Sequence, residues 1–108
     1  MQLVLIFHSN ESAWVQMTPA ERERGMAAYS SFNEAMQKAG ILRSGNRLRT
    51  SPAATTVRVV NGKTQVPDGP HSDLGGYCII DVADHDAAIA WAARFPAASH
   101  GAVEVRPL

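Results

Sequence analysis

Two segments with helical spacing and several short apolar runs alternate along this chain. The run Leu3 to His8 has no helical spacing and suits a central strand that is covered on both faces. A helix is predicted from Thr18, which can form a capping box with Glu21, to a stop at Gly40. The stretch before it, which holds Trp14, is predicted to be a loop. The helix should bury residues three and four positions apart, namely Met26, Tyr29, Phe32, Met36 and Ala39.

The second half of the chain carries β-strand and turn signals and one more helix. Residues 41–48 predict a strand that bends or bulges at Gly45, and Asn61-Gly62 predicts a hairpin turn between two β-prone runs. The run "GYCIIDV", residues 76–82, predicts a further strand, and residues 102–108 alternate apolar and charged positions. Asp84 can cap the second helix, which should end at Pro96. The residues of that helix expected to face inward are Ala88, Trp91, Ala92 and Phe95.

This order of elements predicts an α+β protein with the ferredoxin-like order βαββαβ and an inserted β-hairpin. The length of 108 residues fits one domain that spans residues 1–108. Right-handed crossovers between neighbouring parallel strands would place both helices on one face of the sheet. The apolar residues of the other face predict a homodimer, in which a second copy covers that face sheet to sheet.

Charge and composition narrow the classes of partner. Ten basic and ten acidic residues balance and the arginines are dispersed, so binding to nucleic acid or to an anionic membrane is not expected. The single cysteine, Cys78, lies in an apolar run and is expected to be a buried, inert thiol. The chain starts without signal-peptide features, and no apolar run reaches the roughly 18 residues of a membrane helix. A cytoplasmic protein is therefore expected.

Most of the candidate chemistry lies in the stretch "VPDGPHSDLGGY", residues 66–77. Asp68-Gly69-Pro70 has the composition of a turn. The same turn would hold the Asp68 carboxylate at the mouth of a pocket, where it can bind a ligand or act as a base. His71 and Asp73 are either a histidine–carboxylate pair for acid–base chemistry or two solvated loop side chains.

Other segments supply further candidates, each with a structural alternative. His8, at the end of the first strand, either lines the pocket or is a satisfied strand-end histidine. Trp14 can close over a ligand as a lid, and Tyr77 can line the pocket, although an aromatic side chain beside the core also suits packing. Arg106 shares a strand face with Glu104, which suits a salt bridge across a dimer or a ligand clamp.

No metal and no tightly held cofactor is predicted. His8, Asp68 and His71 have the residue types of a metal site, but their spacing specifies none.

Five stretches in series resemble the YCII-related superfamily, and within it the bacterial DGPF-domain group. They cover nearly the whole chain and read "LVLIFHSNESAW", "AAYSSFNEAMQKAGIL", "TTVRVVNGKTQVPDGP", "LGGYCIIDVADHDAAIAWAARFP" and "GAVEVRPL". The resemblance implies a dimeric ferredoxin-like α/β barrel, with a pocket between the sheet and the loops at its rim. Some members are encoded near, or fused to, extracytoplasmic-function sigma factors, so the resemblance also suggests a link to sigma-factor-dependent regulation.

The chain departs from the pattern of its relatives in the loop and in the first helix. His71 stands where the group's name calls for phenylalanine, and only Ser72 and Asp73 separate it from "LGGY", where relatives carry a longer segment. Members of the broader superfamily have a proposed His/Asp pair with its histidine on the first helix. That helix contains no histidine here, so we do not carry that dyad over to this chain.

Two classes of function follow. The first is a small-molecule-binding protein or a cofactor-independent acid–base enzyme with a pocket near the Asp68-Gly69-Pro70 loop. Its candidate catalytic residues are Asp68, His71 and His8, and its candidate ligand-binding residues are Asp68, Gly69, Pro70, Tyr77, Trp14 and Arg106. The second class is a non-catalytic regulatory or interaction module. A pocket that brings several polar groups to one point would favour the first class, whereas a flat face would favour the second.

Overall fold

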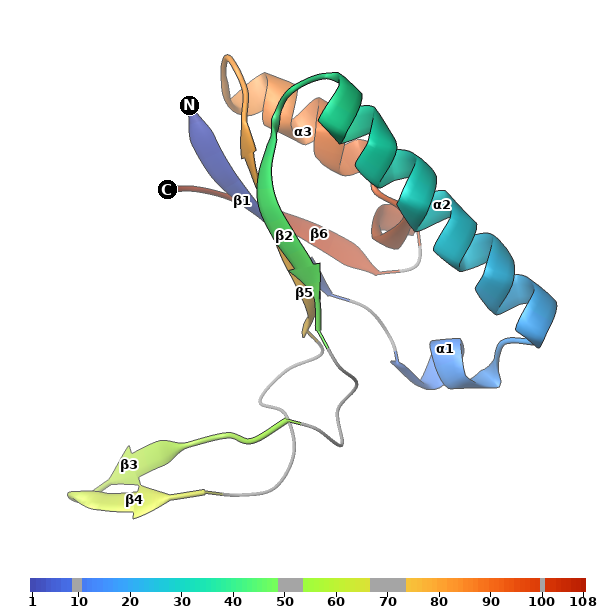
Figure 1. Cartoon of the computed structure of the whole chain (residues 1–108). Helices are drawn as coiled ribbons and strands as arrows, with labels where there is room; N and C mark the ends of the chain where they lie inside the picture. Colours follow the sequence, from blue (N-terminus) through green and yellow to red (C-terminus); the bar gives the residue numbers. More distant parts are fainter. Residues whose placement is uncertain (9–10, 49–53, 67–73, 100) are drawn as a thin grey trace.

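A four-stranded sheet carries the two long helices on one of its faces (Figure 1). The computed structural model describes residues 1–8, 11–48, 54–66, 74–99 and 101–108. In sheet order the strands are β2 (Leu42–Arg47), β5 (Leu74–Asp81), β1 (Gln2–His8) and β6 (Ala102–Pro107). Every neighbouring pair is antiparallel. The expected α+β, ferredoxin-like architecture is therefore confirmed.

One expectation about the sheet was wrong. Neither crossover joins neighbouring parallel strands, because β1 lies between β5 and β6, and β5 lies between β1 and β2. Strands β1 and β2 run in the same direction, since each is antiparallel to β5, and β5 and β6 do so because each is antiparallel to β1. Both helices still cover the same face of the sheet, as a right-handed crossover requires.

The capping residues predicted from local sequence define the helix ends. Helix α2 (Pro19–Lys38) begins at Thr18, whose Oγ1 accepts from the backbone N–H of Glu21 at 3.2 Å, and the Glu21 carboxylate completes the capping box. Helix α3 (His85–Ala93) begins at Asp84, whose carboxylate accepts from the Ala87 N–H at 2.8 Å. A short 3₁₀ helix, Pro96–Ser99, follows α3. None of the helices within the described ranges is both long enough and apolar enough to cross a lipid bilayer.

The stretch around Trp14 is a helix, α1 (Glu11–Gln16), and not the predicted loop. The Arg22 side chain of α2 donates to the carbonyl oxygens of Trp14 at 3.3 Å and of Val15 at 2.7 Å. These carbonyls lie at the end of α1, and that of Trp14 also accepts from the backbone N–H of Met17 at 3.2 Å, so Arg22 adds a second donor there. A tertiary contact thus stabilises a helix that is only six residues long.

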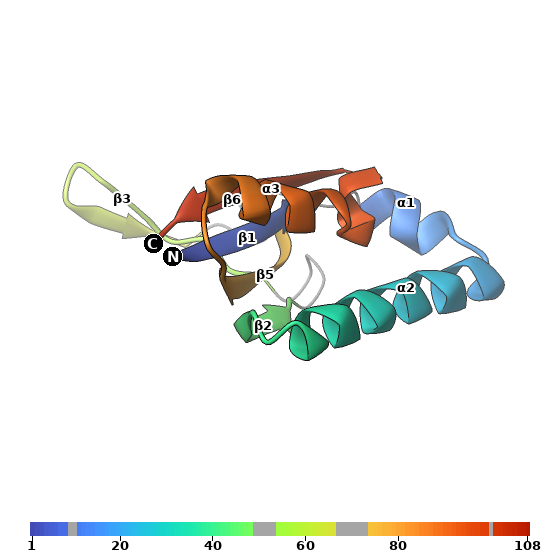
Figure 2. The same cartoon turned by 90° about the horizontal axis from the view of Figure 1, so that it is seen from above.

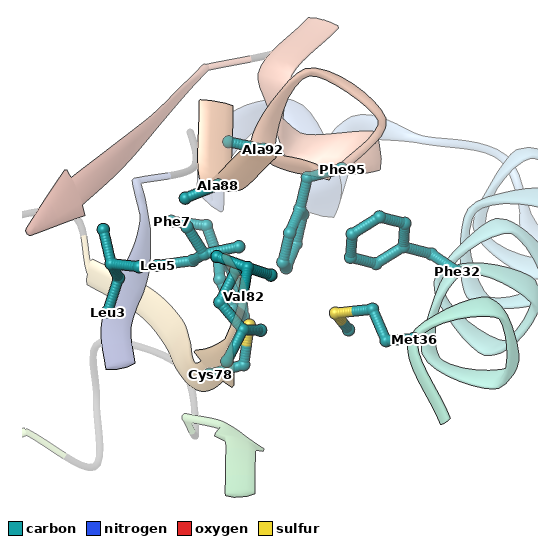
Figure 3. Close-up of a cluster of buried hydrophobic side chains, with 11 residues drawn as sticks. Leu3, Leu5, Phe7, Phe32, Met36, Cys78, Val82, Ala88, Ala92 and Phe95 are labelled. Carbon is teal, nitrogen blue, oxygen red and sulfur yellow. The ribbon is translucent and has the colours of Figure 1, made fainter. Parts of the chain in front are cut away.

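The core lies between the helices and the face of the sheet that they cover (Figure 3). Alternate residues of β1 are buried, and Leu3 and Leu5 have no exposed surface. The rings of Phe7, Phe32 and Phe95 point toward a common centre, with centroids 4.6 Å apart for Phe7 and Phe95 and 4.7 Å apart for Phe32 and Phe95. Burial of such aromatic side chains is a main source of stability in a small domain.

The buried stripe of α2 is shorter than predicted. Phe32 and Met36 are buried, whereas Met26 is 47% exposed and Ala39 is exposed. Both residues have the expected spacing, but Met26 lies in the N-terminal half of α2 and Ala39 is its C-cap. The spacing of apolar residues predicts which face of a helix is buried. It does not predict how many turns of that face the sheet covers.

A bulge is present in β2, although it does not lie at Gly45. The register between β2 and β5 shifts between Leu42 and Ser44. Gly45 is required for a different reason: a Cβ built there would lie 2.8 Å from the Cys78 Cβ. The glycine therefore allows β2 to approach β5 closely.

The predicted hairpin is present, and it projects away from the sheet and the helices (Figure 2). Strands β3 (Arg58–Val60) and β4 (Lys63–Gln65) are joined by Asn61 and Gly62, which have φ angles of 52° and 75°. Two consecutive positive φ angles are the conformation that the Asn-Gly pair predicts.

Candidate functional site

A pocket of about 240 Å³ lies between α2 and the covered face of the sheet, beside the edge strand β2. Its walls are mainly apolar and come from β1, β2, β5, α2 and Phe95, which lies between α3 and the 3₁₀ helix. An apolar cavity of about 150 Å³ can hold a benzene ring, so this pocket has room for a single-ring compound. The lining residues are Phe7, Met26, Tyr29, Ser30, Phe32, Asn33, Met36, Leu42, Gly45, Asn46, Arg47, Tyr77, Cys78 and Phe95.

The way α2 packs on the sheet explains where the pocket lies. Phe32 and Met36 in the C-terminal half of α2 pack onto the sheet, whereas Met26 in the N-terminal half is exposed. Gly45 has no side chain to fill the space above β2. The pocket therefore lies where the helix and the sheet are incompletely packed against each other.

Arg47 lies at the last position of β2 and lines the pocket. Its guanidinium carbon lies 4.6 Å from the centroid of the Trp14 ring and 5.8 Å from that of the Tyr29 ring. Its Nη1 donates to the sulfur of Met26 at 2.7 Å. Among the described residues Arg47 forms no ion pair with a carboxylate. An arginine held by aromatic rings and without a carboxylate partner can bind an anion.

Two other titratable groups of the pocket remain protonated at neutral pH. Burial raises the pKa of Tyr29, and the positive charge of Arg47 opposes that shift in part. Burial also raises the pKa of the Cys78 thiol to about 11. Tyr29 is therefore available as a hydrogen-bond donor, and Cys78 is not a nucleophilic thiolate.

A second polar cluster lies on the opposite, uncovered face of the sheet. The Nε2 atom of His8 lies 3.5 Å from the Oε1 atom of Glu104, and the Nε atom of Arg106 contacts the other oxygen of the same carboxylate. His8 and Glu104 are diagonal neighbours on the paired strands β1 and β6. Arg106 reaches Glu104 along β6, as expected for two residues on the same strand face.

The whole chain, residues 1–108, matches the model of the YCII-related domain. The protein belongs to the YCII-related family. It is 34% identical to the uncharacterised protein R00369 of Rhizobium meliloti (strain 1021), over all of this chain and 92% of that protein.

A solved structure shares the fold of this YCII-related protein. The two superpose with a TM-score of 0.59 at 14% identity, over all of this chain and 93% of the other. That structure is 5-chloro-2-hydroxyhydroquinone dehydrochlorinase (TftG) from Burkholderia phenoliruptrix AC1100, in complex with 2,5-dihydroxybenzoquinone. At this level of identity the similarity shows the fold alone.

The structure separates the site residues that the sequence suggested for this YCII-related protein. Tyr77 borders the pocket, but its register partner is Ile6, so its side chain lies on the uncovered face of the sheet. Trp14 packs against Arg47, which lines the pocket. His8 and Arg106 lie together on the other face of the sheet, and neither lines this pocket. The remaining candidates lie outside the described residues and are Asp68, Gly69, Pro70 and His71.

Sequence reasoning missed Arg47 as a site residue and assigned Tyr29 to the core alone. Trp14, Tyr29 and Arg47 come from three separate elements, and no local pattern links them. The one available signal was the polar run "SGNR" inside a predicted strand, which indicated an exposed edge. Within the described parts of the chain, no three His, Cys, Asp or Glu side chains come together as potential metal ligands.

Proposed function

We propose that this YCII-related protein binds a small molecule in the pocket between α2 and the sheet. One observation carries the proposal: the lining of a ring-sized, mainly apolar pocket includes Ser30, Asn33, Tyr29 and Arg47, and the Arg47 guanidinium lies 5.8 Å from the centroid of the Tyr29 ring. Small-molecule sites combine apolar walls with a few convergent polar groups in this way. The solved structure of the dehydrochlorinase with a bound benzoquinone supports a ring compound as the kind of ligand.

We propose cofactor-independent acid–base catalysis as the finer form of this function. The described lining contains no carboxylate and no imidazole. A base for this pocket would therefore come from the loop that holds Asp68 and His71, in keeping with the sequence hypothesis. Asp68 would then act as the base or would bind a hydroxyl group of the ligand.

A thermal-shift screen of metabolites tests both forms of the proposal with three proteins: the wild type, Ser30→Trp and Asp68→Asn. Ser30 is an exposed lining residue of α2, so a tryptophan there can occupy the pocket without removing a core contact. A ligand that binds the folded state raises its apparent stability. We expect a ring compound to stabilise the wild type and Asp68→Asn but not Ser30→Trp.

Catalysis would be supported if the wild type converts that compound and Asp68→Asn binds it without converting it. Binding without turnover by any of the three proteins would support a binding protein alone. Equal stabilisation of the wild type and Ser30→Trp would place the ligand elsewhere and would reject the proposed pocket.

A second candidate function is an interaction module, and the projecting hairpin favours it. Val57, Val59 and Val66 on and beside the hairpin are 60%, 68% and 58% exposed. Clustered exposed apolar side chains on a projecting element are typical of interaction surfaces. If this is the principal function, Val59→Lys should remove partner binding, whereas Ser30→Trp should leave it unchanged.

We also propose that a second copy covers the uncovered face of the sheet. Val4, Ile6 and Ile79 occupy its centre and are only half-buried in the single chain. The family resemblance implies a dimeric ferredoxin-like α/β barrel, which agrees with this proposal.

A further inference from the structure

We propose that the pocket selects ligands that carry an anionic group on a ring-sized apolar body, and that Arg47 binds the anionic group. This inference rests on the proposed binding function and adds the chemical class of the ligand to it. A ring carboxylate is the simplest member of the class.

The charge of the lining supports an anion. Arg47 is the one charged residue among the lining residues of the described chain, and none of those residues is Asp or Glu. The other lining residues are uncharged and mostly apolar, and charge–charge interactions are stronger beside such walls than in water. A carboxylate in the pocket would gain this interaction, whereas a neutral ligand of the same shape would gain only the apolar contact.

The hydrogen-bonding state of Arg47 supports the same conclusion. A guanidinium group has five N–H donors in a planar fork that matches a carboxylate. Its hydrogen bond within the described chain goes to the sulfur of Met26, and a thioether is a weak acceptor. The aromatic contacts with Trp14 and Tyr29 involve the faces of those rings and occupy no strong acceptor. Arg47 therefore retains donors for a carboxylate.

The aromatic neighbours explain how Arg47 is held in place. The Trp14 ring packs against Gly25 of α2, where a Cβ would lie 3.2 Å from the ring. Helix α1, which carries Trp14, is in turn fixed to α2 by Arg22. The guanidinium thus lies against a supported ring at the edge of the pocket, with the apolar walls beside it. This arrangement suits a ligand with an apolar body and one charged end.

Arg94 offers a matched control, because its guanidinium lies 4.4 Å from the centroid of Trp91 and it does not line the pocket. The experiment measures binding of benzoate and of its neutral isostere benzamide by titration calorimetry and ligand-observed NMR. The proteins are the wild type, Arg47→Met, Arg47→Lys, Arg94→Met and Ser30→Trp. The temperature of unfolding of each variant is recorded first, and Arg47→Lys serves as the test if Arg47→Met does not fold.

We expect the wild type and Arg94→Met to bind benzoate about 10-fold or more tightly than benzamide, since hydrogen bonds to charged groups are worth at least that ratio. Arg47→Met should bind the two compounds equally, and Arg47→Lys should bind benzoate with intermediate affinity, because it keeps the charge and loses the fork. Ser30→Trp should bind neither compound.

Two results would overturn the inference, and they differ in what they say about the proposed function. Equal affinity of the wild type for benzoate and benzamide, with both lost in Ser30→Trp, would reject anion selection and leave the pocket as the binding site. Unchanged binding of both compounds in Ser30→Trp would reject the pocket as well.

Discussion

At the scale of single residues, glycines determine how closely the strands of this protein approach. Gly76 is buried in β5, in register with Phe7 of β1 and Arg47 of β2. A Cβ built at Gly76 would lie 2.7 Å from the carbonyl oxygen of Asn46 and closer still to the ring of Phe7. The side chain of Phe7 also lines the pocket, so this contact links the core to the site.

Gly76→Ala should therefore destabilise the protein by about 1–3 kcal/mol, the usual cost of overpacking a core. Urea unfolding followed by tryptophan fluorescence measures the change. The double variant Gly76→Ala with Phe7→Leu should recover part of the loss, because the leucine removes the ring that the new methyl group meets. A fully stable single variant would show that the strands can separate without cost.

Cys78 gives a pH-dependent test of burial. The thiol is 5% exposed, and its pKa is raised from 9.0 to about 11. The unfolded chain therefore releases this proton at a lower pH than the folded protein does. The contribution of the group to stability is present below pH 9 and is lost as the pH rises toward about 11.

We expect the free energy of unfolding to fall more steeply between pH 9 and 11 in the wild type than in Cys78→Ala. The folded wild type should also react only slowly with iodoacetamide at pH 8, because the thiolate is the reactive form. Rapid alkylation of the native protein, or parallel pH profiles for the two proteins, would mean that the thiol is accessible to solvent.

At the scale of the elements, contacts over a few residues could be predicted, and contacts between distant segments could not. The caps at Thr18 and Asp84 and the Asn61-Gly62 turn involve residues no more than three positions apart, and all three are present. Helix α1 was missed because part of what stabilises it is a pair of hydrogen bonds from Arg22 on another helix. The cluster of Trp14, Tyr29 and Arg47 was missed because its members come from three separate elements, α1, α2 and β2.

Arg22→Ala should loosen α1 by removing the two hydrogen bonds to its last carbonyls. We expect a cost of about 1 kcal/mol, which should appear mainly as faster amide hydrogen exchange in α1 and less in the core. Arg24→Ala, a neighbouring arginine without contacts to α1 among those described, is the matched control. Equal exchange rates in the two variants would show that α1 does not depend on Arg22.

At the scale of the whole molecule, the uncovered face of the sheet indicates how copies of the chain associate. The sequence predicted the ferredoxin-like order, because alternating strand and helix patterns leave few other topologies. It could not show which polar residues lie on which face, since the bulge in β2 and the shift beside His8 change the alternation. His8 was therefore a candidate pocket residue in the sequence, whereas in the structure it lies on the opposite face of the sheet, beside Glu104.

If a second copy covers that face, the wild type should sediment at twice its chain mass of 11.6 kDa. Ile79→Asp places a charge at the centre of the face and should give a monomer, whereas Ile89→Asp, at an exposed position of α3, should remain a dimer. A dimer of Ile79→Asp together with a monomer of Val59→Asp would assign the association to the hairpin instead.

The central claim is that the ligand site lies between α2 and the sheet, on the face that carries the core. An NMR titration of the ¹⁵N-labelled protein with benzoate tests it most directly, because amide, arginine Nε and indole signals report each face separately. We predict shifts at the Arg47 Nε–H, the Trp14 indole N–H, Gly45 and Tyr29, with little change at Val4, Ile6 and Glu104. Shifts confined to Val4, Ile6 and Glu104 would place the site on the opposite face and contradict the account.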